Sequence, residues 1–99
     1  MQRDLTEASV IAAGEDVVAC DLADGAALLD LRSSTYFTLN EVGSQVWGLI
    51  REPKQVSEVG DALLMRYDVD PARCRQDLVA LLQQLADAGL INISDAGRP

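Results

Sequence analysis

Apolar and polar residues alternate over short stretches in the first 40 residues of the chain, a pattern typical of β-strands. Residues 17–22 and 26–31 read as two strands, and the turn signal Asp24-Gly25 joins them into a hairpin. Residues 35–38 read as a third strand after a second turn. The pattern therefore predicts a three-stranded antiparallel sheet.

After residue 40 the apolar residues recur at spacings of three and four, which predicts three amphipathic helices. The first covers about 41–51 and follows Asn40, a residue type that caps helices. The second begins at Ser57, and the third and longest covers about 71–88. Residues 90–94 are open to two interpretations: a last short strand, or a segment that packs its apolar residues on the core.

This order of elements divides the chain into one folded domain, residues 16–94, and two flanking segments. Residues 1–15 show little periodicity, so we expect a loose arm, with a short strand suggested near Val10–Ala12. Residues 95–99 are expected to form a tail. Strands followed by helices predict an α+β fold. Because a tight link joins the last two helices, we expect them to form a helix-turn-helix pair. With the hairpin as the wing, the expected fold is winged helix-turn-helix-like.

The charge of the chain narrows the choice of partners. Acidic residues outnumber basic ones by 16 to 8, which gives a net charge of −8. Because Lys and Arg drive binding to phosphate backbones, this charge opposes nucleic-acid binding and favours cationic or apolar partners. No run approaches the ~20 apolar residues of a membrane span, and the N-terminus lacks the features of a signal peptide. We expect a cytoplasmic protein.

The residue types present argue against catalysis. The chain contains no histidine, the commonest general base and metal ligand. It has no glycine-rich phosphate loop, and the acidic pair Asp68 and Asp70 is explained by the capping position of Asp70. Cys20 and Cys74 form no CxxC motif and are expected to be buried small hydrophobic residues. We expect no enzyme activity, cofactor or metal.

Two binding functions remain in competition. A DNA-binding winged helix would read DNA with its third helix, which should then be basic. Here that helix carries Asp77 and Asp87 as well as Arg73 and Arg75, so its charge argues against this alternative. A peptide-binding module needs an open strand edge beside an apolar helix, and the chain offers both.

The third strand has no proline and runs directly into a helix, so it can lie at the sheet edge with unpaired backbone groups. An extended peptide can add to such an edge as an extra strand, and a groove against the third helix would contact its side chains. For Leu78 and Leu82 a role in the core alone is the competing interpretation. Arg75 and Asp77 can equally be ordinary solvated charges. The candidate peptide-binding residues are Thr35, Tyr36, Phe37, Thr38, Arg75, Asp77, Leu78, Val79 and Leu82.

The segment from Leu28 to Trp47, with Thr-Tyr-Phe-Thr-Leu-Asn at its centre, resembles the PqqD-like proteins, also called RiPP recognition elements. Further matches are Tyr67-Asp-Val-Asp-Pro, the Leu-rich run that begins at Asp77, and the ending Ala-Gly-Leu-Ile at residue 91. The resemblance covers about residues 16–93.

The resemblance implies a non-catalytic peptide chaperone. Its leader peptide would add a strand to residues 35–38 and lie against the third helix, where Asp77 falls at a position that is often acidic in the family. The module would present a ribosomally made precursor to a separate enzyme. That enzyme is a radical SAM protein in PQQ biosynthesis and a leader peptidase in lasso-peptide pathways. The same open edge is also compatible with a homodimer.

Overall fold

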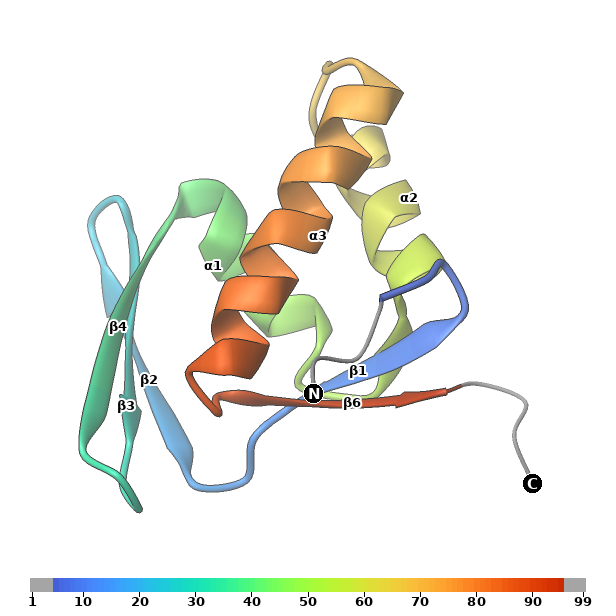
Figure 1. The fold of residues 1–99 in the computed structure, drawn as a ribbon. Coiled ribbons are helices and arrows are strands. Elements are labelled where there is room, and N and C mark those ends of the chain that lie inside the picture. The colour runs from blue at the N-terminus through green and yellow to red at the C-terminus, as the bar shows by residue number, and fades with distance from the viewer. Residues whose placement is uncertain (1–4, 96–99) are drawn as a thin grey trace.

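The computed structural model of the protein describes residues 5–95, which Figure 1 traces. Residues 1–4 of the expected arm and 96–99 of the expected tail lie outside this part. The strands described form two antiparallel three-stranded sheets, β2–β3–β4 and β5–β1–β6. The elements, in chain order, are β1 (Ser9–Ala13), β2 (Val17–Leu22), β3 (Gly25–Asp30), β4 (Thr35–Asn40), α1 (Glu41–Leu49), β5 (Lys54–Gln55), α2 (Val56–Arg66), α3 (Pro71–Asp87) and β6 (Ile91–Asp95).

The sheet β2–β3–β4 is the one that the strand pattern predicts. Both of its hairpins are antiparallel, and the register places Val18 opposite Leu29 and Leu29 opposite Tyr36. Helix α1 contacts β3 and β4 of this sheet. In Figure 1 the sheet stands on the left, with α1 and α3 to its right. The predicted combination of a three-stranded antiparallel sheet with three helices is therefore confirmed.

The second sheet was not predicted. Its central strand, β1, lies within residues 1–15, where we expected a loose arm, and pairs with β5 and β6. The short strand suggested near Val10–Ala12 is therefore present. Residues 91–95 form a strand too, which includes the first residue of the expected tail. Ile11 of β1 is fully buried, and burial of a side chain of this size stabilises the strand by about 1.5–3 kcal/mol.

Helices α1 and α3 begin where the sequence places capping residues, whereas α2 begins at Val56, one residue before the predicted start. The side chain of Asn40 caps α1, and that of Asp70 caps α3 by accepting a hydrogen bond from the Arg73 N–H at 3.0 Å. Pro71 occupies the first position of α3, where a missing N–H costs nothing. After α3, Gly89 has a φ of +76°, the left-handed conformation that commonly ends a helix.

The hydrophobic core lies between the sheets and the helices. Leu39 is buried, and Phe37 packs against the core while partly exposed, as expected for both. Within residues 5–95, no helix has the length and apolar character needed to cross a membrane. The fully buried apolar side chains come from both sheets and all three helices: Ile11, Leu28, Val46, Ile50, Val59, Leu82, Leu85 and Leu90.

The prediction that both cysteines are buried is wrong for Cys20. Cys20 is exposed on the outer face of the β2–β3–β4 sheet, whereas Cys74 is half-buried. Strand β2 begins with four consecutive apolar residues, 17–20, so its sequence does not show which side chains face the core. The outer face also exposes Val18 and Tyr36, which lie in one row across the sheet.

Candidate peptide-binding site

Strand β4 forms one edge of its sheet. It pairs with β3 on one side, and no strand of the described part of the chain pairs with the other. Helices α1 and α3 lie to the same side of this sheet in Figure 1. The predicted open edge therefore exists in the described part of the chain.

Hydrogen bonds at the end of β3 show the direction of its backbone groups. The N–H of Leu31 donates to the carbonyl of Asp16, which precedes β2, at 2.9 Å. The carbonyl of Asp30 accepts instead from the N–H of Ser34, on the β4 side, at 2.7 Å. Since these directions alternate along an antiparallel strand, the even-numbered residues of β3 face β4.

The register carries this alternation over to β4. Leu28 lies opposite Phe37, so the backbone N–H and C=O of Phe37 point toward β3. The N–H and C=O groups of Tyr36 and Thr38 consequently point away from the sheet. These four groups form the unpaired edge that an added strand would use.

The side chains of β4 alternate between two environments. Thr35 and Phe37 are half-buried on the inner face, whereas Tyr36 and Thr38 are exposed on the outer face. Tyr36 is 65% exposed and is not among the described residues that pack against the core. The strand can therefore offer its backbone to a ligand while Phe37 and Leu39 stay packed.

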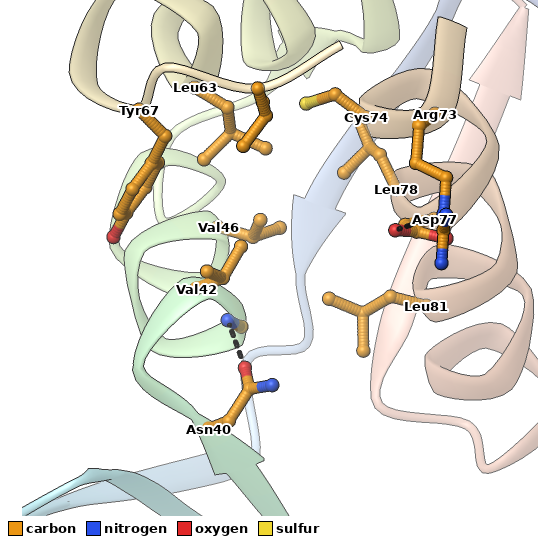
Figure 2. Close-up of a pocket in the computed structure, with 12 residues that line it drawn as sticks. Asn40, Val42, Val46, Leu63, Tyr67, Arg73, Cys74, Asp77, Leu78 and Leu81 are labelled. Atoms are coloured by element: carbon orange, nitrogen blue, oxygen red, sulfur yellow. Dashed lines mark hydrogen bonds and ion pairs between the residues drawn. The ribbon is translucent and has the colours of Figure 1, made fainter. Parts of the chain in front are cut away.

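A cavity of about 410 Å³ opens between α1 and α3 at the Asn40 end of β4 (Figure 2). Asp77 and Arg73 are its charged lining residues, and their side chains lie 3.9 Å apart. The Tyr67 hydroxyl is buried and has no hydrogen-bond partner among the residues described. The remaining lining residues are mostly apolar: Asn40, Val42, Gly43, Val46, Leu63, Val69, Cys74, Leu78 and Leu81.

Two predicted residues of α3 reach this cavity. Asp77 stands at its mouth with an exposed side chain, and Leu78 is 3% exposed, so it belongs to both the floor and the core. Cys74 and Leu81 line the cavity beside them but were not predicted. Their spacing from Asp77 and Leu78, three and four residues, places all four on one helix face, and this signal was available in the sequence.

Three other predicted residues of α3 do not line the cavity. Leu82 is fully buried in the core, which is the competing interpretation that the sequence left open. Val79 is half-buried. Arg75 forms an ion pair with Glu7, in the segment before β1. The hydrogen bond and charge of Glu7 raise the pKa of the Arg75 guanidinium.

The arm is held at a second point, because the Glu7 carbonyl accepts a hydrogen bond from the Ser57 N–H at 3.0 Å. Glu7 therefore connects the segment before β1 to both α2 and α3. The structure thus divides the predicted residues of α3 between the cavity, the core and a contact with the arm.

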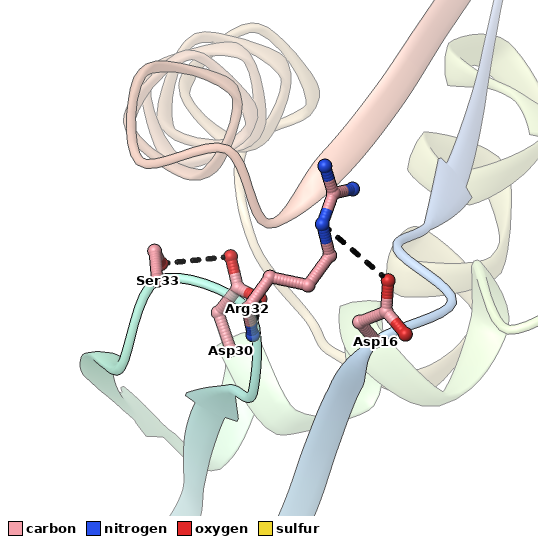
Figure 3. Close-up of polar contacts among 4 residues, drawn as sticks. All are labelled: Asp16, Asp30, Arg32 and Ser33. Carbon is pink, nitrogen blue, oxygen red and sulfur yellow. Dashed lines mark hydrogen bonds and ion pairs between the residues drawn. The ribbon is translucent and has the colours of Figure 1, made fainter.

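Polar contacts fix the turn that leads into β4 (Figure 3). The Asp30 carboxylate accepts hydrogen bonds from the Arg32 N–H at 3.0 Å and from the Ser33 hydroxyl at 2.9 Å. Both bonds lower the pKa of the Asp30 carboxyl group, and the bond from the Arg32 backbone has the larger effect. Arg32 also lies 3.7 Å from the Asp16 carboxylate. Ser34, with a φ of +61°, completes the turn and sets the first residue of β4.

The cavity favours an uncharged thiol at Cys74. Burial raises the pKa of Cys74, and the negative charge of Asp77 raises it further. A thiol with a raised pKa is a poor nucleophile. Among the residues described, no group of three or more Cys, Asp or Glu side chains is arranged to hold a metal ion. The uncharged thiol therefore adds to the mostly apolar lining of the cavity.

Comparison with known proteins places the chain in a family. The family described as Coenzyme PQQ synthesis protein D (PqqD) matches residues 25–91, about two thirds of the chain. The protein therefore belongs to the PqqD family, as the sequence resemblance suggested. The matched range begins with β3 and includes β4 and all three helices.

Solved structures share the fold. The structure described as TbiB1 in complex with the TbiA(beta) leader peptide is 34% identical, with a TM-score of 0.75, and the match covers 89% of this chain and 98% of that one. Lasso peptide synthetase B1 complexed with the leader peptide is 22% identical, with a TM-score of 0.72, and the match covers 83% of this chain and 96% of that one. The PqqD truncation of Methylobacterium extorquens PqqCD, described as a stand-alone RiPP recognition element, is 22% identical, with a TM-score of 0.75. That match covers 90% of this chain and 95% of the other.

A curated relative is the PqqA binding protein of Rhodopseudomonas palustris (strain TIE-1), 36% identical over 52 residues. The alignment takes in 52% of this chain and spans about half, 51%, of the relative's length. These four relatives are peptide-binding proteins or recognition elements by description, so they give no support to the DNA-binding alternative.

Proposed function

We propose that this protein binds the leader of a ribosomally made precursor peptide by strand addition to β4 and has no catalytic activity of its own. The observation that carries the proposal is the pair of outward-facing backbone segments at Tyr36 and Thr38, beside an apolar cavity. Backbone pairing supplies affinity for a peptide of any sequence, and pockets for its side chains supply selectivity.

The groove of the proposal runs between β4 and α3. A peptide strand paired with residues 35–38 continues past Asn40 into the cavity, where it meets Asp77, Leu78 and Leu81. Leu82 supports the groove from the core, and Arg75 acts by holding Glu7 of the arm. The fold is winged helix-turn-helix-like, used here to bind a peptide instead of DNA.

The bound leader is presented to a separate modifying enzyme in the cytoplasm. The descriptions of the relatives point to two candidate pathways, PQQ biosynthesis and lasso-peptide biosynthesis. The enzyme that receives the leader would be a radical SAM protein in the first and a leader peptidase in the second. Val18, Leu29 and Tyr36 give the outer sheet face exposed apolar surface, which is typical of sites that meet another protein. A homodimer through the β4 edge would compete with the peptide for the same backbone groups.

Calorimetric titration tests this function. The first ligand is the synthetic TbiA(beta) leader, and the second is the leader of a precursor peptide if one is encoded beside the gene. Saturable one-to-one binding of a leader is expected. A random DNA duplex at low salt is the control and should not bind. Specific DNA binding together with no leader binding would overturn the proposal in favour of a winged-helix regulator.

A further inference from the structure

Strand β2 forms the second open edge of the β2–β3–β4 sheet. It pairs with β3 on one side, and within residues 5–95 no strand pairs with its other side. Odd-numbered residues of β3 direct their backbone groups toward β2, so those of Val18, which lies opposite Leu29, are used in the sheet. The N–H and C=O groups of Ala19 and Asp21 consequently point away from the sheet.

The side chains of β2 are left uncovered on both faces of the sheet. Val18, Cys20 and Leu22 are exposed on the outer face, and Ala19 and Asp21 are exposed on the inner face. Edge strands are usually protected from pairing by proline, lysine or a bulge, and β2 has none of these. An apolar edge of this kind favours pairing with a further strand, and Asp21 is its one charged residue.

Charge along this edge is concentrated at Asp21. A hollow of about 410 Å³ lies beside the other end of β2, next to Val17 and Ala19, and its lining includes one acid, Glu15, and one base, Arg51. Asp21 forms none of the ion pairs found between the described residues. A cation opposite Asp21 on an added strand is therefore favoured, whereas an acid there is repelled.

These features define a sequence pattern for a strand that adds antiparallel to β2. Successive residues of such a strand lie opposite Asp21, Cys20, Ala19 and Val18. Those opposite Cys20 and Val18 point to the outer face, where they extend the exposed apolar surface that Val18 shares with Leu29. The pattern is therefore Lys or Arg, an apolar residue, any residue, and a second apolar residue.

We propose that β2 is a second strand-addition edge, which receives a segment with this pattern from the enzyme to which the leader is presented. The inference rests on the proposed function and adds where the enzyme docks. Because β2 and β4 lie on opposite sides of β3, both strands can add at the same time. A second copy of the chain fits less well: pairing Ala19 with its counterpart places Val17 opposite Asp21 and joins two chains of net charge −8.

Selection from a phage-displayed library of random peptides, on protein saturated with the TbiA(beta) leader, tests this inference. The baits are the unaltered protein, Ala19→Pro, which removes an outward donor at the β2 edge, and Thr38→Pro, which removes one at the β4 edge. The unaltered protein and Thr38→Pro should enrich the pattern. Ala19→Pro should not enrich it, although this variant should fold by circular dichroism and bind the leader by calorimetry.

Resynthesised peptides test the role of charge at Asp21. Exchange of the selected Lys or Arg for Glu should weaken binding to the unaltered protein about fivefold at low salt and less at high salt. Asp21→Asn should remove most of this difference. Glu52→Gln, which removes one negative charge from an exposed loop, is the matched control and should retain it.

Equal enrichment by Ala19→Pro and the unaltered protein would overturn the inference, as would selected peptides that displace the leader. A dimer in sedimentation equilibrium that Ala19→Pro abolishes would assign the edge to self-association and would also overturn it. Enrichment of no peptide by a protein that binds the leader would overturn the inference and leave the proposed function intact. Absence of leader binding would instead count against the proposed function.

Discussion

The side-chain oxygen of Asn40 accepts a hydrogen bond from the backbone N–H of Gly43 at 2.8 Å (Figure 2). This bond ends β4 and begins α1, and both residues line the cavity. A Cβ on Gly43 would stand only 3.1 Å from the Leu39 side chain, so the close approach at this position is to a core side chain. The open edge and the cavity therefore meet at one helix cap.

Loss of this cap should destabilise the fold. Asn40→Ala removes the acceptor for the Gly43 N–H, and we expect the free energy of unfolding to fall by about 1 kcal/mol. Asn40→Asp keeps the acceptor and should cost little. Urea denaturation of the three proteins measures this difference. An Ala variant as stable as the parent would show that the bond does not hold α1.

Leu82 should prove to be a core residue. It is fully buried, so Leu82→Asp places a charge where it has no solvent, and we expect loss of folding by circular dichroism. Leu82→Ala should cost about 2–5 kcal/mol. Leu81→Ala, at the half-buried cavity wall, should fold and bind leader more weakly. A folded Leu82→Asp variant with reduced leader affinity would return Leu82 to the groove.

The turn at Asp30 should make stability depend on pH. Its pKa is lowered in the folded state, so its contribution is present above the unfolded value of about 3.9 and is lost as the pH falls through the folded value. Asp30→Asn should therefore reduce the free energy of unfolding more at pH 7 than at pH 3. Glu52→Gln, which also removes one charge, is the control. An equal cost of Asp30→Asn at both pH values would contradict this account.

Strand addition predicts a selective effect at Thr38. Its N–H points away from β3, so Thr38→Pro removes a donor that the free protein does not use in its sheet. The fold should survive while leader affinity falls at least tenfold by calorimetry. Thr38→Val, which keeps the N–H and removes the hydroxyl, should bind as the parent does. Unchanged affinity of a folded Thr38→Pro variant would exclude pairing at this residue.

Much of the fold followed from local patterns. Strands β2 to β4 and the three helices were predicted. Local backbone chemistry at Asn40 and Asp70 marks the starts of α1 and α3, and Gly89 marks the end of α3. Strand β1 was only suggested, since its partners lie more than 40 residues away, at residues 54–55 and 91–95. A pairing of that separation leaves no local signal.

The site was predicted less completely than the fold. The edge at residues 35–38 followed from a strand that runs directly into a helix. The face of α3 was predicted only in part, because its apolar stripe from Cys74 to Leu85 contains both cavity residues, such as Leu81, and core residues, such as Leu82. Packing against α2 and contact with Glu7 decide which side remains open, and neither is visible in the helix sequence.

Amide hydrogen exchange of β4, followed residue by residue by NMR, tests the central claim most directly. In the free protein the N–H groups of Tyr36 and Thr38 should exchange quickly, while that of Phe37, which faces β3, should be protected. Saturation with the leader should slow exchange at Tyr36 and Thr38 and leave Phe37 unchanged. Fast exchange at both residues in a protein saturated with leader would contradict strand addition to β4.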